Sequence, residues 1–217
     1  MSDLRQRKFV RTRLAVAEAT LAALQRQSLD AVPVRQLCRE AEISEATFFN
    51  YFPRKQELLA YLAQLWLLEL GWHARAAGGS GLGAIEALFA HTARRCIDRT
   101  ALMRELVAWL ARGGQLDGGQ PLQDIEKRLA FPELAGIEQV QVRGIDALLD
   151  EQLVAAVRRG ELPDNTLMPA LLVELLAILF GIPLVLLSSD PRRIALMYQQ
   201  QLQITWAGVR ATSSSAA

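Results

Sequence analysis

The chain has 217 residues, of which 51% are apolar and only 6% aromatic, and its formal net charge is +1. That length is sufficient for a well-buried core in one or two domains, and the near-neutral charge excludes a partner selected by bulk charge alone. Two cysteines, Cys38 and Cys96, are too few for a disulfide framework, and the polar first ten residues do not resemble a signal peptide. We therefore expect a reduced, cytoplasmic location.

Positive charge is concentrated at the start of the chain. Residues 1–60 hold ten Lys/Arg against seven Asp/Glu, and the basic residues of the first turns are Arg5, Arg7, Lys8, Arg11 and Arg13. A helix is predicted over about 8–27, because one side of it would carry Val10, Leu14, Ala17, Leu21 and Leu24. Arg11 and Arg13 fall off that side, so they either approach DNA phosphates or are simply solvated.

Residues 32–55, VPVRQLCREAEISEATFFNYFPRK, predict two short helices joined by a tight turn. Ser44 is a natural N-cap for the second helix, in which Phe48 and Phe52 lie one turn apart and point inward. The outer side of this helix presents Glu45, Ala46, Thr47, Phe49, Asn50 and Tyr51. Such a helix is typical of a helix-turn-helix recognition element, although generic helical hairpins share the spacing.

The same segment resembles the DNA-binding segment of the TetR (tetracycline-repressor-like) regulators. The matching residues are Val34, Leu37-Cys38, Ala41, Ile43-Ser44, Thr47-Phe48-Phe49, Tyr51-Phe52, Lys55 and Leu58-Leu59. The segment departs from the family pattern at Pro33 (a capping Thr), Glu42 (the turn Gly) and Phe49 (a Tyr). By motif position, the resemblance implies base contacts from Arg35, Glu45, Ala46 and Thr47 and phosphate contacts from Thr47, Tyr51 and Lys55, with Phe49 and Asn50 on the same DNA-binding face.

Beyond Pro53 the apolar spacing continues to predict helices. Their expected ranges are 54–76, 84–98, 100–112 and 133–159, with a short helix before Pro132 and loops at 78–83 and 113–121. The helix over 133–159 would carry Ile137, Val140, Gly144, Leu148 and Ala155. No strand pattern is visible in the sequence.

One face of the helix over 54–76 combines apolar and ionisable residues, namely Leu62, Trp66, Glu69 and His73. A carboxylate and an imidazole on an apolar surface need partners, so they either pair with each other or line a ligand cavity. Neighbouring helices would supply the apolar wall through Phe89, Met103 and Trp109. We expect His91 to be exposed, because it lies off the apolar face of its own helix.

No catalytic or metal chemistry is predicted. The two histidines and two cysteines lack the spacing of metal ligands, and no nucleophile motif surrounds any serine. We therefore predict neither a metal, nor a cofactor, nor an enzymatic activity.

The C-terminal third predicts two long helices. Residues 167–187 are apolar enough to raise a membrane span, but Glu174 and Pro183 lie within them, so burial by protein is the preferred reading. The helix over 191–210 places Ile194, Met197, Gln201, Ile204 and Gly208 along one seam, and the tail 211–217 is predicted to be disordered. The TetR resemblance implies that both helices pair with their twofold mates, through Glu174, Ile178 and the seam residues.

The sequence thus predicts an all-α fold of about nine helices. A helix-turn-helix DNA-binding domain would occupy residues 1–53, and a larger helical domain for ligand binding and dimerisation would occupy 54–217. By resemblance, the function is that of a homodimeric repressor that binds palindromic operator DNA and is released by a small-molecule effector. The residues of the expected ligand cavity predict that this effector is largely apolar. The alternative is a helical protein anchored in a membrane through 167–187.

Overall fold

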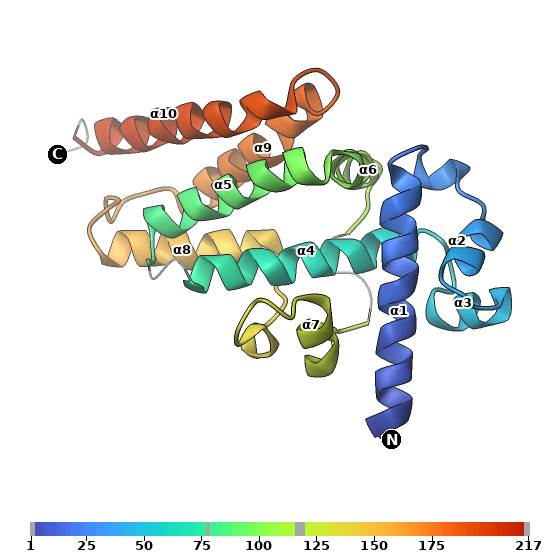
Figure 1. The fold of residues 1–217 in the computed structure, drawn as a ribbon. Coiled ribbons are helices and arrows are strands. Elements are labelled where there is room, and N and C mark those ends of the chain that lie inside the picture. Colours follow the sequence, from blue (N-terminus) through green and yellow to red (C-terminus); the bar gives the residue numbers. More distant parts are fainter. Residues whose placement is uncertain (1–2, 77–78, 116–119, 215–217) are drawn as a thin grey trace. The chain divides into compact units, whose positions relative to one another are not determined.

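The computed structural model describes residues 3–76, 79–115 and 120–214 (Figure 1). These ranges contain ten α-helices, three short 3-10 helices and no strand, which confirms the all-α fold. The helices divide into two compact units, residues 1–69 with 108–142 and residues 70–107 with 143–217. The division falls inside helix α4 (Glu57–Ala76), so the expected domain boundary after residue 53 lies within the first unit.

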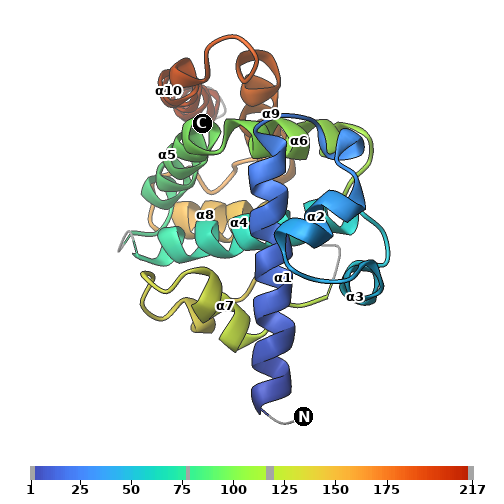
Figure 2. The same ribbon diagram turned by 45° about the vertical axis from the view of Figure 1, so that its right-hand side comes forward.

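The first unit contains the helix-turn-helix segment. Its elements are α1 (Asp3–Leu24), η1 (Leu29–Ala31), α2 (Val34–Glu40), α3 (Glu45–Tyr51), the first part of α4, α7 (Asp124–Ala130) and η2 (Ile137–Gln139). Helix α1 packs against α2 and α7, and α2 packs against α3 (Figures 1 and 2). Val10, Leu37 and Phe48 are fully buried, so the predicted apolar sides of α1, α2 and α3 do form the core of this unit.

A buried group of charged and polar side chains joins three helices of the first unit. The Arg13 guanidinium lies 3.3 Å from the Glu126 carboxylate, and the Tyr61 hydroxyl donates a hydrogen bond of 2.7 Å to the same carboxylate. Burial and the adjacent Glu126 raise the pKa of Tyr61, so the phenol keeps its proton and remains a donor. The expectation that Arg13 approaches DNA is therefore wrong, whereas Arg11 is exposed.

The second unit is a set of long packed helices. Its elements are the last part of α4, α5 (Leu82–Asp98), most of α6 (Thr100–Ala111), α8 (Ile145–Arg158), α9 (Met168–Leu186), η3 (Pro191–Arg193) and α10 (Ile194–Ser214). Helix α5 packs against both α8 and α10, and α9 packs against the same two helices. The buried Tyr198 hydroxyl donates to the Leu179 carbonyl oxygen at 2.6 Å, which ties α10 to α9.

Two predicted segments differ from the structure. The single helix over 133–159 is wrong: Gly136 adopts a left-handed φ of 76°, and α8 begins only after Gly144. Ile137 is buried in the 3-10 helix η2 and Val140 at its C-cap, so their spacing reflected burial and not an α-helix. The predicted disorder of 211–217 is wrong up to Ser214, where α10 ends. Residues 215–217 lie outside the described chain, as do residue 77, residue 78 of the first predicted loop and residues 116–119 of the second.

Helix α9 is unusually apolar and little covered. Among the described residues it alone is long and apolar enough to cross a membrane, and 22% of its most apolar window is buried. Length and composition are weak evidence for a membrane span, because the core helix of a soluble protein meets the same criteria.

Candidate DNA-binding site

The turn between α2 and α3 is closed by local hydrogen bonds. The backbone N–H of Ile43 donates to the Cys38 carbonyl at 2.9 Å, which reverses the chain after α2. Glu42 within this turn has a φ of 54°, the left-handed conformation that glycine adopts most easily. A non-glycine residue pays roughly 1–2 kcal/mol there, so the departure from the family's turn glycine carries a conformational cost.

The orientation of α3 is fixed from both of its sides. Ser44 caps its first turn by accepting a hydrogen bond from the Thr47 backbone N–H at 3.1 Å, as predicted. Phe48 and Phe52 are both buried, and their ring centroids lie 5.8 Å apart. Because Phe48 faces the core from within the seven-residue helix and Phe52 does so from its C-cap, the opposite face of the helix is held toward solvent.

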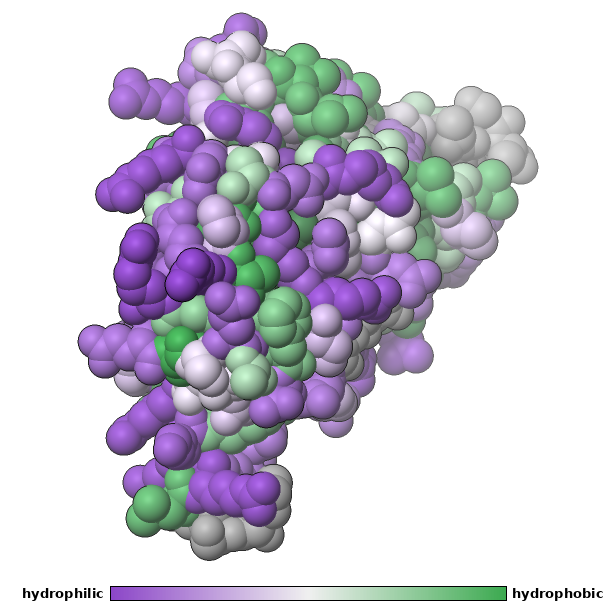
Figure 3. Space-filling model, turned by 90° about the vertical axis from the view of Figure 1, so that its right-hand side faces the viewer, coloured by the Kyte–Doolittle hydropathy of each residue, from purple (hydrophilic) through white to green (hydrophobic). Residues whose placement is uncertain are grey.

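The outward face of α3 consists of the residues expected to meet DNA. Glu45, Ala46 and Asn50 are exposed, and Phe49 is 45% exposed with its ring edge against Phe48. The side of the molecule seen in Figure 3, on which α2 and α3 lie, is mainly hydrophilic with scattered small hydrophobic areas. Such a surface suits a hydrated, charged partner better than an apolar one.

The two half-buried residues of α3 are supported by neighbouring side chains. Thr47 lies beside the Ser44 hydroxyl at 2.9 Å. The Tyr51 ring lies 4.8 Å from the Phe9 ring of α1, which restricts its movement. Both side chains reach the surface from fixed positions, as a phosphate contact requires.

Arg35 and Lys55 occupy different environments. Arg35 is exposed on the first turn of α2. The Lys55 ammonium donates to the carbonyl oxygens of Asp30 at 2.9 Å and Val32 at 3.1 Å, so it also joins the segment just before α4 to η1. The phosphate contact expected of Lys55 remains a prediction and would use its third N–H.

Cys38 is a core residue and not a reactive thiol. It is buried in α2, and burial, with a smaller effect from Glu45, raises the pKa of its thiol. A neutral thiol behaves as a small apolar side chain.

The residues predicted to bind a ligand are distributed over both units. Leu62, Trp66, Glu69 and Trp109 belong to the first unit, and His73, Phe89 and Met103 to the second. All are buried except His73 and Trp109, which are half-buried, and Phe89 packs edge-on against Tyr198 at 4.9 Å. The predicted ligand cavity remains a prediction.

The expectation that His91 is exposed is wrong. It is 4% exposed, not solvated, and its ring centroid lies 4.1 Å from that of His73. Because α5 packs against two helices, its buried surface extends beyond one apolar face. The buried row of Ala84, Leu88 and His91, spaced by four and three residues, was the available signal.

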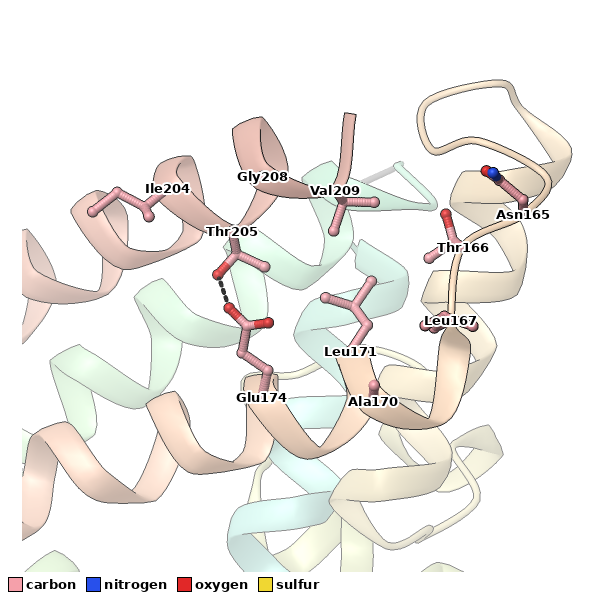
Figure 4. A pocket seen from close by; sticks show the side chains of 10 residues that line it. All are labelled: Asn165, Thr166, Leu167, Ala170, Leu171, Glu174, Ile204, Thr205, Gly208 and Val209. Carbon is pink, nitrogen blue, oxygen red and sulfur yellow. Dashed lines mark hydrogen bonds between the residues drawn. The ribbon is translucent and has the colours of Figure 1, made fainter. Parts of the chain in front are cut away.

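Helices α9 and α10 form the candidate dimer surface. Glu174, Ile204 and Gly208 are exposed, and Ile178, Met197 and Gln201 are half-buried, as an interface would need. Ile194 is fully buried within its own unit, so its assignment to the interface is wrong. Two grooves lie along this surface, of about 630 and 560 Å³, and in the first the Thr205 hydroxyl donates to Glu174 at 2.6 Å (Figure 4).

Comparison with known proteins supports this description of the fold. Residues 16–62 match the profile of the family described as bacterial regulatory proteins, tetR family. The structure resembles Thermus thermophilus FadR, a TetR-family transcriptional repressor in complex with lauroyl-CoA (19% identity, 89% of this chain and 92% of that chain, TM-score 0.63). It also resembles Salmonella enterica GusR (18% identity, 92% and 95%, TM-score 0.60) and the ketosteroid transcriptional regulator KstR2 of Mycobacterium tuberculosis (15% identity, 91% and 94%, TM-score 0.56). A search of curated proteins finds no significant match.

The chain is thus an all-helical protein in which α2 and α3 form a helix-turn-helix. Residues 16–62 match the tetR-family profile, and the fold of tetR-family transcription regulators extends over nearly the whole chain, which confirms the resemblance seen in the sequence.

Proposed function

We propose that the protein is a cytoplasmic, ligand-responsive repressor that binds a palindromic operator as a homodimer and is released by a small-molecule effector. The observation that carries this proposal is the outward face of α3. Phe48 and Phe52 anchor the helix from within, and Glu45, Ala46 and Asn50 remain exposed on the other side. A helix fixed in this way can enter a major groove without losing its own packing.

The chemistry of the exposed residues suits base reading. Arginine can bind guanine through two hydrogen bonds in the major groove, so Arg35 is suited to one base pair. Glu45 can accept from the amino group of cytosine, and Asn50 can make paired bonds with adenine. Tyr51 and the remaining N–H of Lys55 would hold phosphates and so fix the register on the duplex.

A second copy of the chain is the partner proposed for α9 and α10. The exposed apolar side chains of α9 include Val173, Leu184 and Val185, and Ile204 of α10 is 64% exposed. Two copies related by a twofold axis would cover the same surface on each other, and the axis would impose a palindromic operator. A membrane-embedded α9 is the competing reading, and a chain that requires detergent to stay dispersed would support it.

Helix α4 is the element proposed to carry the effector signal. It contributes residues to both units, and the Lys55 contacts tie the segment just before it to η1. A ligand that favours one position of its far end would change the placement of the recognition helix in the dimer, by about 1–3 kcal/mol of coupling. The buried Leu62 and Trp66 favour a largely apolar effector, and the lauroyl-CoA bound by the structurally similar FadR is in part of that class.

Capture of genomic fragments by the purified protein tests the proposal. We expect enriched fragments to share an inverted repeat, and footprinting to show protection of two half-sites about one helical turn apart, roughly 34–36 Å. Asn50→Asp should reduce the enrichment because it adds negative charge to the DNA-facing side, whereas Glu133→Gln at an exposed position outside the motif should leave it unchanged. Recovery of fragments without any common sequence would contradict the proposal.

A further inference from the structure

We propose that Glu69, His73 and His91 bind a divalent transition-metal ion. One donor atom from each of these three side chains lies within 4.8 Å of the others. Such a set of one carboxylate and two imidazoles is a ligand set used for zinc in proteins, with a fourth position left for water or another ligand. This inference does not depend on DNA binding.

Two of the ligands are placed by a single helix. The division between the units falls directly after Glu69, but α4 continues from Glu57 to Ala76. Glu69 and His73 are therefore one turn apart on the same side of one helix, and their relative position follows from helix geometry. A carboxylate and an imidazole at this spacing can bind one ion without a change of backbone.

The third ligand comes from α5, within the second unit. The His73 and His91 rings lie 4.1 Å apart between centroids and are inclined by 30°. Around a tetrahedral ion with bonds of about 2.1 Å, donor atoms lie roughly 3.4 Å apart. To bind one ion, the donor atoms must therefore move closer to one another by up to about 1.4 Å, and rotation of the side chains can supply this movement.

The burial of the ligands suits a specific site better than a surface contact. Glu69 is 7% and His91 4% exposed, and Leu70 and Leu88, their neighbours along α4 and α5, are buried. An apolar surrounding restricts water and strengthens coordination. His73 is only half-buried, which leaves a route by which an ion can enter.

The donor types select the class of ion. Mg²⁺ and Ca²⁺ prefer oxygen ligands, so a site with two imidazole nitrogens favours zinc, cobalt or nickel. The cysteines contribute nothing to this set: Cys96 is buried elsewhere on α5, and burial raises the pKa of its thiol to about 12.

The test is metal titration of the untagged full-length chain after chelator treatment. We expect one Zn²⁺ or Co²⁺ bound per chain, a higher melting temperature with the ion, and a cobalt spectrum without a thiolate charge-transfer band. His73→Ala and Glu69→Gln should each weaken binding by at least about 10–100-fold, the effect known for loss of a residue that merely supports a ligand. Glu86→Gln, at an exposed carboxylate of α5, should bind as the unchanged chain does.

Each remaining outcome decides the proposal. Circular dichroism identifies the variants that fold. If His73→Ala does not fold, His91→Gln, which replaces the most deeply buried of the three ligands, is tested instead. Absence of saturable binding, or saturable binding that the ligand variants leave unchanged, would overturn the site. A cobalt spectrum dominated by a thiolate band would assign the ion to a cysteine and would overturn it equally.

Discussion

The two units of this chain depart from ordinary globular packing in opposite ways. The first buries charge, since Arg13 and Glu126 are both almost inaccessible to solvent. The second exposes hydrocarbon, since Leu184 and Val185 of α9 are 63% and 70% exposed. A buried charge must find its partner inside the fold, whereas an exposed apolar helix gains stability only from a surface outside it.

The two units thus differ in where their unusual residues find their contacts: within the fold in the first unit, and on the surface of another molecule in the second. The Arg13 guanidinium has the Glu126 carboxylate beside it and the Tyr61 ring 4.2 Å below it, so its charge is paired within the first unit. The exposed apolar side chains of α9, Val173, Leu184 and Val185, are not covered by other residues of the described chain. Variants in the first unit should therefore change the free energy of unfolding, and variants on α9 and α10 should change assembly.

The largest expected effect on assembly is that of Ile204→Asp. In a twofold dimer the change occurs twice, and each carboxylate would be buried without a partner. We expect the dimer dissociation constant to rise about 10²–10³-fold, corresponding to roughly 3–4 kcal/mol, with the helical content unchanged. Light scattering or sedimentation without detergent measures the mass of the assembly.

Gln203→Asp is the matched control for that change. Gln203 is exposed on α10 but lines neither groove, so the same charge at this position should leave the dimer intact. Equal masses for the two variants, with both remaining dimeric, would remove Ile204 from the interface.

Glu126→Ala should give the largest loss of stability in the first unit. It leaves the Arg13 guanidinium buried without its carboxylate, at a cost of about 3–5 kcal/mol in the free energy of unfolding. Urea denaturation followed by circular dichroism measures this loss. Glu133→Ala, at an exposed carboxylate of the same unit, should change the midpoint little.

A double variant distinguishes an unpaired charge from lost packing. Replacing both partners, as Arg13→Met with Glu126→Leu, should recover part of the stability, because no charge is then left buried. A double variant as unstable as the two losses combined would show that the packing of the side chains matters more than their charges.

The parts of this molecule that were predictable from sequence are those defined by near neighbours. The capping of α3 by Ser44 involves residues three apart, and the inward Phe48 and Phe52 are four apart. Local spacing determines both, so the orientation of α3 followed from the sequence alone.

The unpredicted parts depend on contacts between distant residues. Arg13 and Glu126 are separated by 113 positions, and no local pattern marks them as a pair. His91 is buried because α5 is covered by two other helices, which a single helical wheel does not represent. The helix predicted over 133–159 is interrupted from Gly136 to Gly144, although Ile137 and Val140 are buried. Buried residues can therefore be spaced as in a helix without forming one.

The next largest expected effect is a loss of DNA affinity through a change on the exposed face of the first unit. Arg35→Ala should weaken binding to the captured operator by about 1–3 kcal/mol and relax the preference at one base pair. Arg128→Ala, which removes one exposed charge from α7, should affect all sequences equally and weakly. A panel of operator variants in a gel-shift assay compares the two, and identical profiles would contradict the base-reading role.

Lys55→Ala should affect both DNA binding and folding. Loss of one phosphate contact would reduce the slope of affinity against salt by about one unit for every sequence. Loss of the bonds to the Asp30 and Val32 carbonyls should also lower the free energy of unfolding, by about 1–3 kcal/mol. A variant with lower stability but an unchanged salt slope would leave Lys55 with a structural role only.

The smallest effect should come from the turn that joins α2 to α3. Glu42→Gly relieves the left-handed strain of about 1–2 kcal/mol. Glycine also raises the conformational entropy of the unfolded chain, which costs roughly 0.5–1 kcal/mol of stability. We therefore expect the free energy of unfolding to rise by about 0.5–1 kcal/mol. Glu42→Gln removes the charge and keeps the strain, so it should leave stability nearly unchanged while raising affinity for all DNA sequences. Thermal unfolding and gel shifts on both variants separate conformation from charge. If the glutamine variant is as stable as the glycine variant, the carboxylate and not the backbone conformation limits stability at this turn.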